Sequence, residues 1–204
     1  MQIRNTLLVL VGLILFAGCV GSAVPFTDDF SDPASGWGAA SNETFVRGYD
    51  SGKYLIRIDN PNWFVWTTAG KRYTDISVET TVYSEGMPDN HYGLLCRQSD
   101  EGAYYFAISS DGYYAIFHQT KDNTLEPLTG TAMLRSPAIH LGGEPNKLLA
   151  VCKGTELTFY VNGEQIAQVE DDTLNRGDIG MAAGTAINAT ATLVWFDDFN
   201  ADKP

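Results

Sequence analysis

The stretch Leu157-Thr158-Phe159-Tyr160-Val161-Asn162-Gly163-Glu164-Gln165-Ile166 decides the fold. Its first half alternates apolar side chains with Thr158 and Tyr160, which is the period of a strand with one buried face. Asn162-Gly163 follows, and both residues adopt positive φ easily, so this dipeptide is a strong signal for a two-residue turn. The stretch therefore predicts a β-hairpin.

The remainder of the chain extends this pattern in both directions. Residues 75–84 alternate in the same way, and Asp111-Gly112 separates two further β-prone runs. Residues 124–143 are less regular, contain Pro127 and Pro137, and predict a longer loop. No segment has a convincing helical pattern. About eleven or twelve short strands joined by turns indicate an all-β domain of two antiparallel sheets.

The hairpin resembles a known group of proteins. Its residues fit the pattern L-x-x-Y-V-N-G-x-x-I of concanavalin A-like lectin/glucanase domains, which include the laminin G-like modules. Gly177-Asp178-Ile179-Gly180 is similar to the next element of that pattern. The runs 26–30 and 196–199 resemble its paired terminal strands. The resemblance covers most of residues 26–200 and implies a jelly-roll sandwich.

Within that superfamily, the chain looks most like bacterial domains described as 3-keto-disaccharide hydrolase-like or family-16-hydrolase-like. The superfamily contains hydrolases, lectins and adhesion modules, so the resemblance implies a fold rather than an activity.

The N-terminal segment predicts export. An apolar run at residues 7–17 ends in Ala17-Gly18-Cys19, which is similar to a bacterial lipoprotein signal whose cysteine is lipidated and becomes the first residue. We expect a signal peptide at 1–18, a short tether at 19–25 and the sandwich domain at 26–204. The protein would be extracytoplasmic and lipid-anchored to the cell membrane or outer membrane. The alternative is an ordinary cleaved signal with an incidental cysteine.

Charge limits the partners. The formal net charge is −12 at pH 7, and an acidic protein repels phosphate backbones, so no nucleic-acid partner is expected. The expected partners are a carbohydrate or envelope glycan, and the membrane through the lipid anchor.

Two cysteines remain in the expected mature domain. Cys96 and Cys152 each lie in an apolar strand pattern. Outside the cytoplasm such a pair can form a disulfide, but two buried free thiols fit the pattern equally well. The sequence has no C-x-x-C motif and no clustered set of cysteines and histidines that would suggest zinc.

Catalytic residues are not evident. The retaining glycosidases of the superfamily that this chain resembles place two carboxylates on one strand face in an E-x-D-x-E run. This chain has no E-x-D-x-E run. Its adjacent acids would point to opposite faces of a strand. The sequence therefore favours a non-catalytic protein, with a glycoside or keto-sugar hydrolase of the same fold as the alternative.

Aromatic and cationic side chains predict a ligand-binding face. Flat rings suit the C–H faces of sugars, with nearby polar groups to fix orientation. We expect five residues to share the outward face of the concave sheet: His91, Arg97, Tyr105, Tyr114 and His118. The alternative is that these tyrosines simply pack within strands.

The resemblance also implies one possible metal site. Sandwiches of this superfamily often hold calcium where the first and last strands meet, and calcium prefers several oxygen ligands. Asp197 and Asp28 are the candidate ligands for a structural calcium, and no cofactor is otherwise required. Together these features favour an anchored sandwich that binds carbohydrate or envelope material. A protein–protein interaction module of the cell envelope is a further alternative.

The anchor is tested by Cys19→Ser. Each buried CH₂ of an acyl chain contributes about 0.8 kcal/mol, so two or three chains hold a protein firmly at a bilayer. Without the thiol we expect the protein to move from the membrane pellet to the soluble fraction after cell lysis and centrifugation. A variant that stays in the pellet would contradict the lipid anchor.

Overall fold

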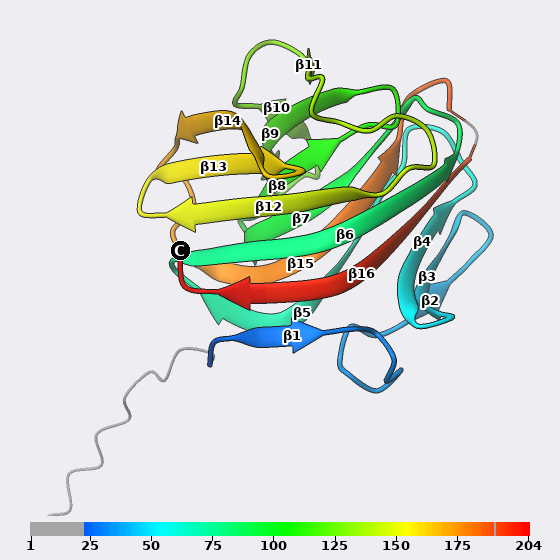
Figure 1. Ribbon diagram of the computed structural model, residues 1–204, viewed down its shortest axis with the longest axis horizontal. Helices are drawn as coiled ribbons and strands as arrows, with labels where there is room; N and C mark the ends of the chain where they lie inside the picture. Colours follow the sequence, from blue (N-terminus) through cyan, green and yellow to red (C-terminus); the bar gives the residue numbers. More distant parts are fainter. Residues whose placement is uncertain (1–22, 190) are drawn as a thin grey trace, which may run out of the picture.

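The computed structural model describes residues 23–189 and 191–204, which form a sandwich of two antiparallel sheets (Figure 1). Sixteen strands and no helix occur in this part of the chain, so none of its segments is a helix able to cross a membrane. The expected all-β, two-sheet fold is confirmed. The expected signal peptide and Cys19 lie outside the described residues.

The larger sheet has nine strands and forms one layer of the sandwich (Figure 1). β1 and β4 lie one after the other along the same edge of the long strand β16. In spatial order the strands are β14 (Glu164–Glu170), β13 (Glu156–Val161), β12 (Asn146–Lys153), β6 (Ile76–Gly86), β16 (Thr192–Asp202), β4 (Lys53–Ile58), β3 (Phe45–Asp50) and β2 (Ala40–Ser41), with β1 (Phe26–Asp28) beside β16.

The smaller sheet has seven strands and lies behind the first in Figure 1. Its edges are formed by β10 at one side and β5 at the other. Its order is β10 (Leu125–Pro127), β9 (Tyr113–Thr120), β8 (Gly102–Ile108), β7 (Asn90–Ser99), β15 (Gly177–Thr185) and β5 (Phe64–Tyr73), with β11 (Leu134–Arg135) also beside β9.

The hairpin turn and the terminal strands that the sequence predicted are present in the structure. Asn162 and Gly163 have φ of 53° and 84° in the turn between β13 and β14, as a two-residue hairpin turn requires. The terminal strands pair, with Asp28 opposite Phe199. The expected strand number was too low, because strands of two or three residues such as β2, β10 and β11 have too few residues for a period. Two of these, β10 and β11, lie in the expected loop 124–143.

The main core fills the space between the sheets. Alternate residues of each strand point into it, among them Ile56, Val78, Phe106, Phe159 and Phe196, each 0% exposed. Burying a large apolar side chain contributes about 1.5–3 kcal/mol, so this layer supplies most of the driving force for folding.

A disulfide crosses this core. Cys96 of β7 in the smaller sheet is bonded to Cys152 of β12 in the larger sheet. Of the two alternatives left open by the sequence, the structure contains the bridge. The sequence separation is 56 residues, so the bond greatly restricts the unfolded chain.

Removal of this bond should destabilise the domain. For a loop of this length the chain-entropy relation gives about 4 kcal/mol at 25 °C, within the usual range of up to about 5 kcal/mol. We expect the double variant Cys96→Ala/Cys152→Ala, and reduced wild-type protein, to unfold at lower urea concentration than the oxidised protein. Equal midpoints for oxidised and reduced wild type would show that the bridge does not stabilise the domain.

Candidate functional site

The outer face of the seven-stranded sheet, which points away from the main core, carries a second apolar cluster. Phe64 and Trp66 of β5 pack against this cluster, and so does Leu125 of β10. The ring of Phe64 on the edge strand β5 contacts the ring of Tyr105 on β8, three strands away, so the sheet curls toward this face. The face is therefore concave. We call its buried members the floor: Leu95, Ala103, Tyr105, Ala107, Ala115, Phe117 and Ala182.

Aromatic rings run across this concave face. Phe64 stacks on Trp66 with ring centroids 5.8 Å apart, and meets Tyr105 edge-on at 5.2 Å. Tyr105 in turn stacks on Phe117 at 5.9 Å. Rings at these separations stabilise one another beyond their burial. Burial raises the pKa of Tyr105 well above its usual value, so its hydroxyl stays protonated and able to donate.

His91 lies among these rings. Its imidazole stacks on Phe64 at 5.8 Å, and Nδ1 is 3.2 Å from the Tyr105 hydroxyl. The ring lies over Gly184, where an added Cβ would come within 2.2 Å of Cε1. Burial lowers the pKa of His91 to about 4, because the charged imidazolium would lose water among apolar neighbours. His91 is therefore neutral at physiological pH.

Two cavities open along the rim of the concave face and meet at Trp66 and Asn123. The first, of about 450 Å³, lies between β3 and β5 and is lined by Phe45, Arg47, Trp63, Phe64, Val65, Trp66 and Asn123. The second, of about 260 Å³, is lined by Trp66, Gln98, Ser99, Asp100, Gly102, Gln119, Thr120, Lys121 and Asn123. We call the two together the rim cleft.

The rim cleft combines exposed aromatic surface with free polar groups. Trp63 is 44% exposed. The Trp66 indole N–H has no hydrogen-bond partner among the described residues and is not sealed from solvent. Asn123 adopts a φ of 61° at the turn between β9 and β10, and its Oδ1 accepts from Gln119 Nε2 at 2.9 Å. That bond fixes the amide and leaves its Nδ2 donors for a ligand.

The five residues expected on one face are divided between two. His91 and Tyr105 lie on the concave face, but Tyr114 and His118 do not. The β8–β9 hairpin places His118 opposite Tyr104, and Tyr114 opposite Ile108. Directly opposed residues share a face, and Tyr104 and Ile108 belong to the main core. The expectation of one shared face was wrong because the register of this hairpin was not known.

Arg97 is also absent from the concave face. Its side chain is 1% exposed. Nε donates to the backbone oxygen of Thr74 and Nη1 to that of Leu174, while Nη2 lies 3.5 Å from the Asp75 carboxylate. A bulge in β7 turns Arg97 to a φ of 56°, which breaks the strict alternation that the sequence prediction assumed.

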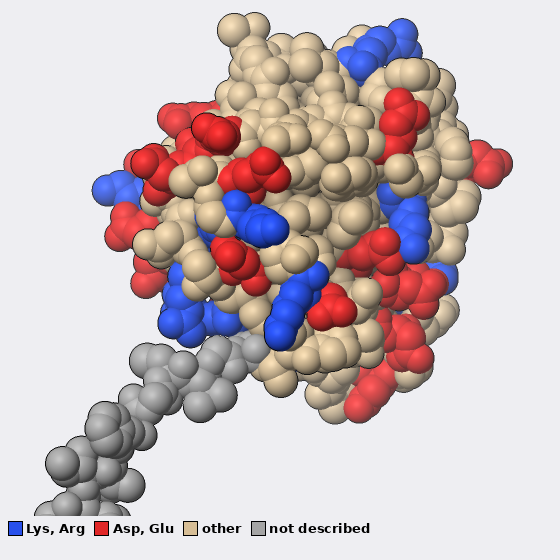
Figure 2. Space-filling model, turned by 60° about the vertical axis from the view of Figure 1, so that its left-hand side comes forward, with Lys and Arg blue, Asp and Glu red and all other residues tan. Residues whose placement is uncertain are grey.

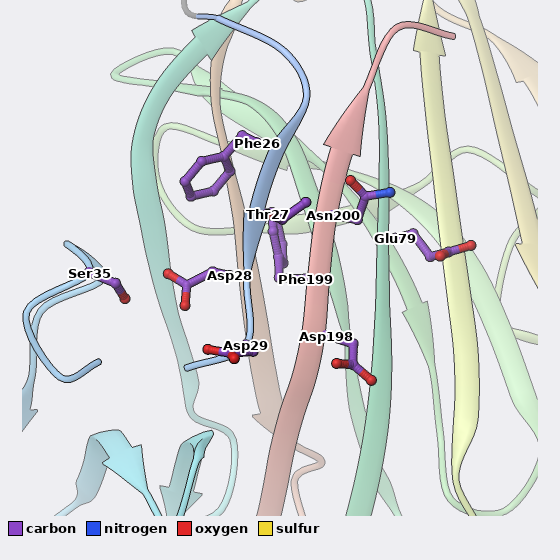
Figure 3. Close-up of a pocket in the computed structure, with 9 residues that line it drawn as sticks. All are labelled: Phe26, Thr27, Asp28, Asp29, Ser35, Glu79, Asp198, Phe199 and Asn200. Carbon is purple, nitrogen blue, oxygen red and sulfur yellow. The ribbon is translucent and has the colours of Figure 1, made fainter. Parts of the chain in front are cut away.

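The two candidate calcium ligands do not converge. The Asp28 carboxylate accepts from the Trp37 indole N–H at 2.9 Å, whereas Asp197 forms an ion pair with Lys53. A cavity does lie between the terminal strands, but its carboxylates are on both sides of β16: Asp28 and Asp29 on one side, Asp198 and Glu79 on the other (Figure 3). Among residues 23–189 and 191–204, no three Asp, Glu, His or Cys side chains are grouped closely enough to hold a metal.

This architecture is the two-sheet antiparallel jelly-roll sandwich that the sequence predicted. A carbohydrate-binding module, CBM66, from Bacillus subtilis has a TM-score of 0.54 and 13% identity over 81% of this chain and 92% of its own. A β-glucanase from Bacillus licheniformis has a TM-score of 0.64 and 10% identity over 92% and 100%. A galectin-like protein of unknown function from Bacillus subtilis has a TM-score of 0.63 and 11% identity over 89% and 97%. These likenesses establish the fold.

Sequence comparisons add little. No known family model matches the chain. A TPR repeat-containing protein of Treponema pallidum is 29% identical over 103 residues, which are 48% of this chain and 12% of that protein. The chain thus spans about an eighth of the length of the curated relative.

The sequence prediction missed the residues that line the rim cleft. The sequence contains a signal for Phe64 and Trp66, because aromatic residues two apart in a strand share a face. It contains no comparable signal for Arg47 or Asn123. Arg47 comes from the other sheet and reaches Trp66 through the packing of the two sheets, whereas Asn123 comes from a turn that the curl of the smaller sheet brings to Trp66.

The buried His91 makes stability depend on pH. Because its folded pKa of about 4 lies below its unfolded value of 6.5, the unfolded chain binds more protons between these values, and stability falls as pH falls through this window. We expect the melting temperature of wild type to drop more than that of His91→Gln between pH 7 and pH 4.5. His140→Gln, at an exposed position, is the control and should follow wild type. Parallel curves for wild type and His91→Gln would contradict this account.

Proposed function

We propose that the domain binds carbohydrate of the cell envelope or its surroundings in the rim cleft. The supporting observation is the combination, in one cleft, of the exposed ring of Trp63 and the half-buried ring of Trp66 with the free amide donors of Asn123. Apolar rings stack on the C–H faces of sugars, and convergent polar groups select the orientation of their hydroxyls. The carbohydrate-binding module among the structural neighbours is consistent with such a use of the fold.

The acidic groups of the cleft favour binding without cleavage. Among the described residues that line it, Asp100 is the single carboxylate. Hydrolysis of a glycosidic bond commonly employs two carboxyl groups, about 5–5.5 Å apart in retaining and about 6.5–9.5 Å apart in inverting enzymes. We therefore propose a binding protein rather than a hydrolase.

We further propose that the domain works outside the cytoplasm on a lipid anchor at Cys19. The disulfide between Cys96 and Cys152 supports this location, because such bonds persist in oxidising compartments. Strand β1 begins at Phe26, so a lipidated Cys19 would hold the sandwich within about 20–25 Å of the bilayer surface.

Saccharide binding is tested with a glycan array, followed by calorimetry on the best ligand. Loss of the stacking surface in Trp66→Ala should weaken binding about tenfold or more, since a buried aromatic side chain contributes about 1.5–3 kcal/mol and 1.4 kcal/mol is tenfold in Kd. Trp195→Ala is the matched control, because Trp195 lies on the larger sheet, away from the rim cleft.

Two results would contradict the proposal. One is the absence of any bound saccharide on the array. The other is equal loss of affinity in Trp66→Ala and Trp195→Ala, which would place the ligand elsewhere. Release of reducing sugar from the bound ligand would contradict the proposal that the protein does not cleave its ligand, and would leave the proposed binding in place.

A further inference from the structure

Arg47 occupies an unusual position for an arginine of this protein. It lies on β3 opposite Ile56, and it lines the first cavity of the rim cleft. Nη1 donates to three oxygen atoms, those of the Thr67 hydroxyl at 2.7 Å, the Tyr54 hydroxyl at 3.2 Å and the Trp37 carbonyl at 3.4 Å. These bonds fix the guanidinium from one end.

The other edge of the guanidinium is free. Nε and Nη2 have no hydrogen-bond partner among residues 23–189 and 191–204, and neither atom is sealed from solvent. These two N–H groups form the parallel pair that matches both oxygens of a carboxylate. Since Arg47 lines the cavity, a ligand there can reach this edge.

Arg47 also lacks a carboxylate partner in the described part of the chain. Arg57, Arg72 and Arg97 each lie within 4.0 Å of an aspartate oxygen. No carboxylate lines the first cavity. The protein otherwise carries a formal charge of −12, and acidic side chains gather at two margins of the face in Figure 2. Arg47 is thus a half-buried cation beside aromatic rings, without a carboxylate partner among the residues described, in a protein whose net charge is negative.

We propose that the rim cleft takes an acidic saccharide, and that Arg47 binds the carboxylate of a uronic-acid unit while Trp63 or Trp66 stacks on a sugar ring. This inference rests on the proposed carbohydrate binding and names the class of ligand. Arg47 is the single charged residue among the described residues that line the first cavity, and one guanidinium balances one negative charge, which suits a carboxylate better than a dianionic phosphate. Salt screens a half-buried ion pair less than an exposed one. The attraction between Arg47 and a carboxylate therefore contributes to ligand selectivity as well as to the association rate.

The test compares oligouronates with their methyl esters on the wild-type protein. Tetramers of galacturonate, glucuronate and mannuronate are titrated by calorimetry at low and high salt. We expect at least one acid to bind about tenfold or more tightly than its ester, and this difference to shrink at high salt. The esters keep the sugar rings, so the comparison isolates the charge without altering the protein.

Variants then assign the effect to Arg47. Arg47→Lys keeps the charge but loses the paired N–H groups, and should remove most of the preference for acid over ester. Arg57→Lys, at an exposed position away from the cleft, should retain it. Because Arg47 also bonds to Thr67 and Tyr54, the melting temperature of each variant is measured. A preference that Arg47→Lys retains would overturn the assignment to Arg47.

The outcomes separate the two proposals. Equal affinity for acids, esters and neutral tetramers would overturn the acidic ligand and leave saccharide binding in place. Tighter binding of a sulfated tetramer than of any uronate would overturn the choice of carboxylate. No binding of any saccharide would overturn both proposals.

Discussion

The curvature of the seven-stranded sheet is the constraint on which the rest of the molecule depends. Side chains from both of its edges, Trp66 on β5 and Leu125 on β10, contact one buried cluster around Tyr105. An open sheet with that face in water would expose this cluster. Curling removes it from solvent, and the same curl brings the turn at Asn123 near Trp66. The hydrophobic effect on the outer face thus shapes the cleft.

This arrangement divides the concave face into two functional parts. The floor, with Tyr105 and Phe117 almost fully buried, contributes to stability. The rim, with Trp63, Trp66 and Asn123, keeps rings and donors accessible. A ligand therefore meets side chains that are supported by a packed layer beneath them, which lowers the entropy lost on binding. The neutral His91, stacked on Phe64, extends the packed layer without adding a charge.

The two layers of the sandwich meet at the cleft. Arg47 and Phe45 come from the larger sheet, whereas Phe64 and Trp66 come from the smaller one. The hydrogen bond of Arg47 on β3 to Thr67 on β5 also joins the two sheets at this side, and the disulfide joins them through the core. The geometry of the cleft is therefore tied to the packing of the sheets, so a binding measurement also reports on that packing.

The sequence by itself determined the all-β fold, the hairpin at Asn162-Gly163 and the pairing of the terminal strands, because alternation and turn chemistry are local. It did not determine which aromatic residues face the cleft. One bulge at Arg97 and the register that sets His118 opposite Tyr104 reverse the faces of residues that strict alternation assigns. Arg47 and Asn123 are far apart in the chain, and only the packing of the two sheets and the curl of the smaller one, which are properties of the whole folded structure, place them in one cleft with Trp66.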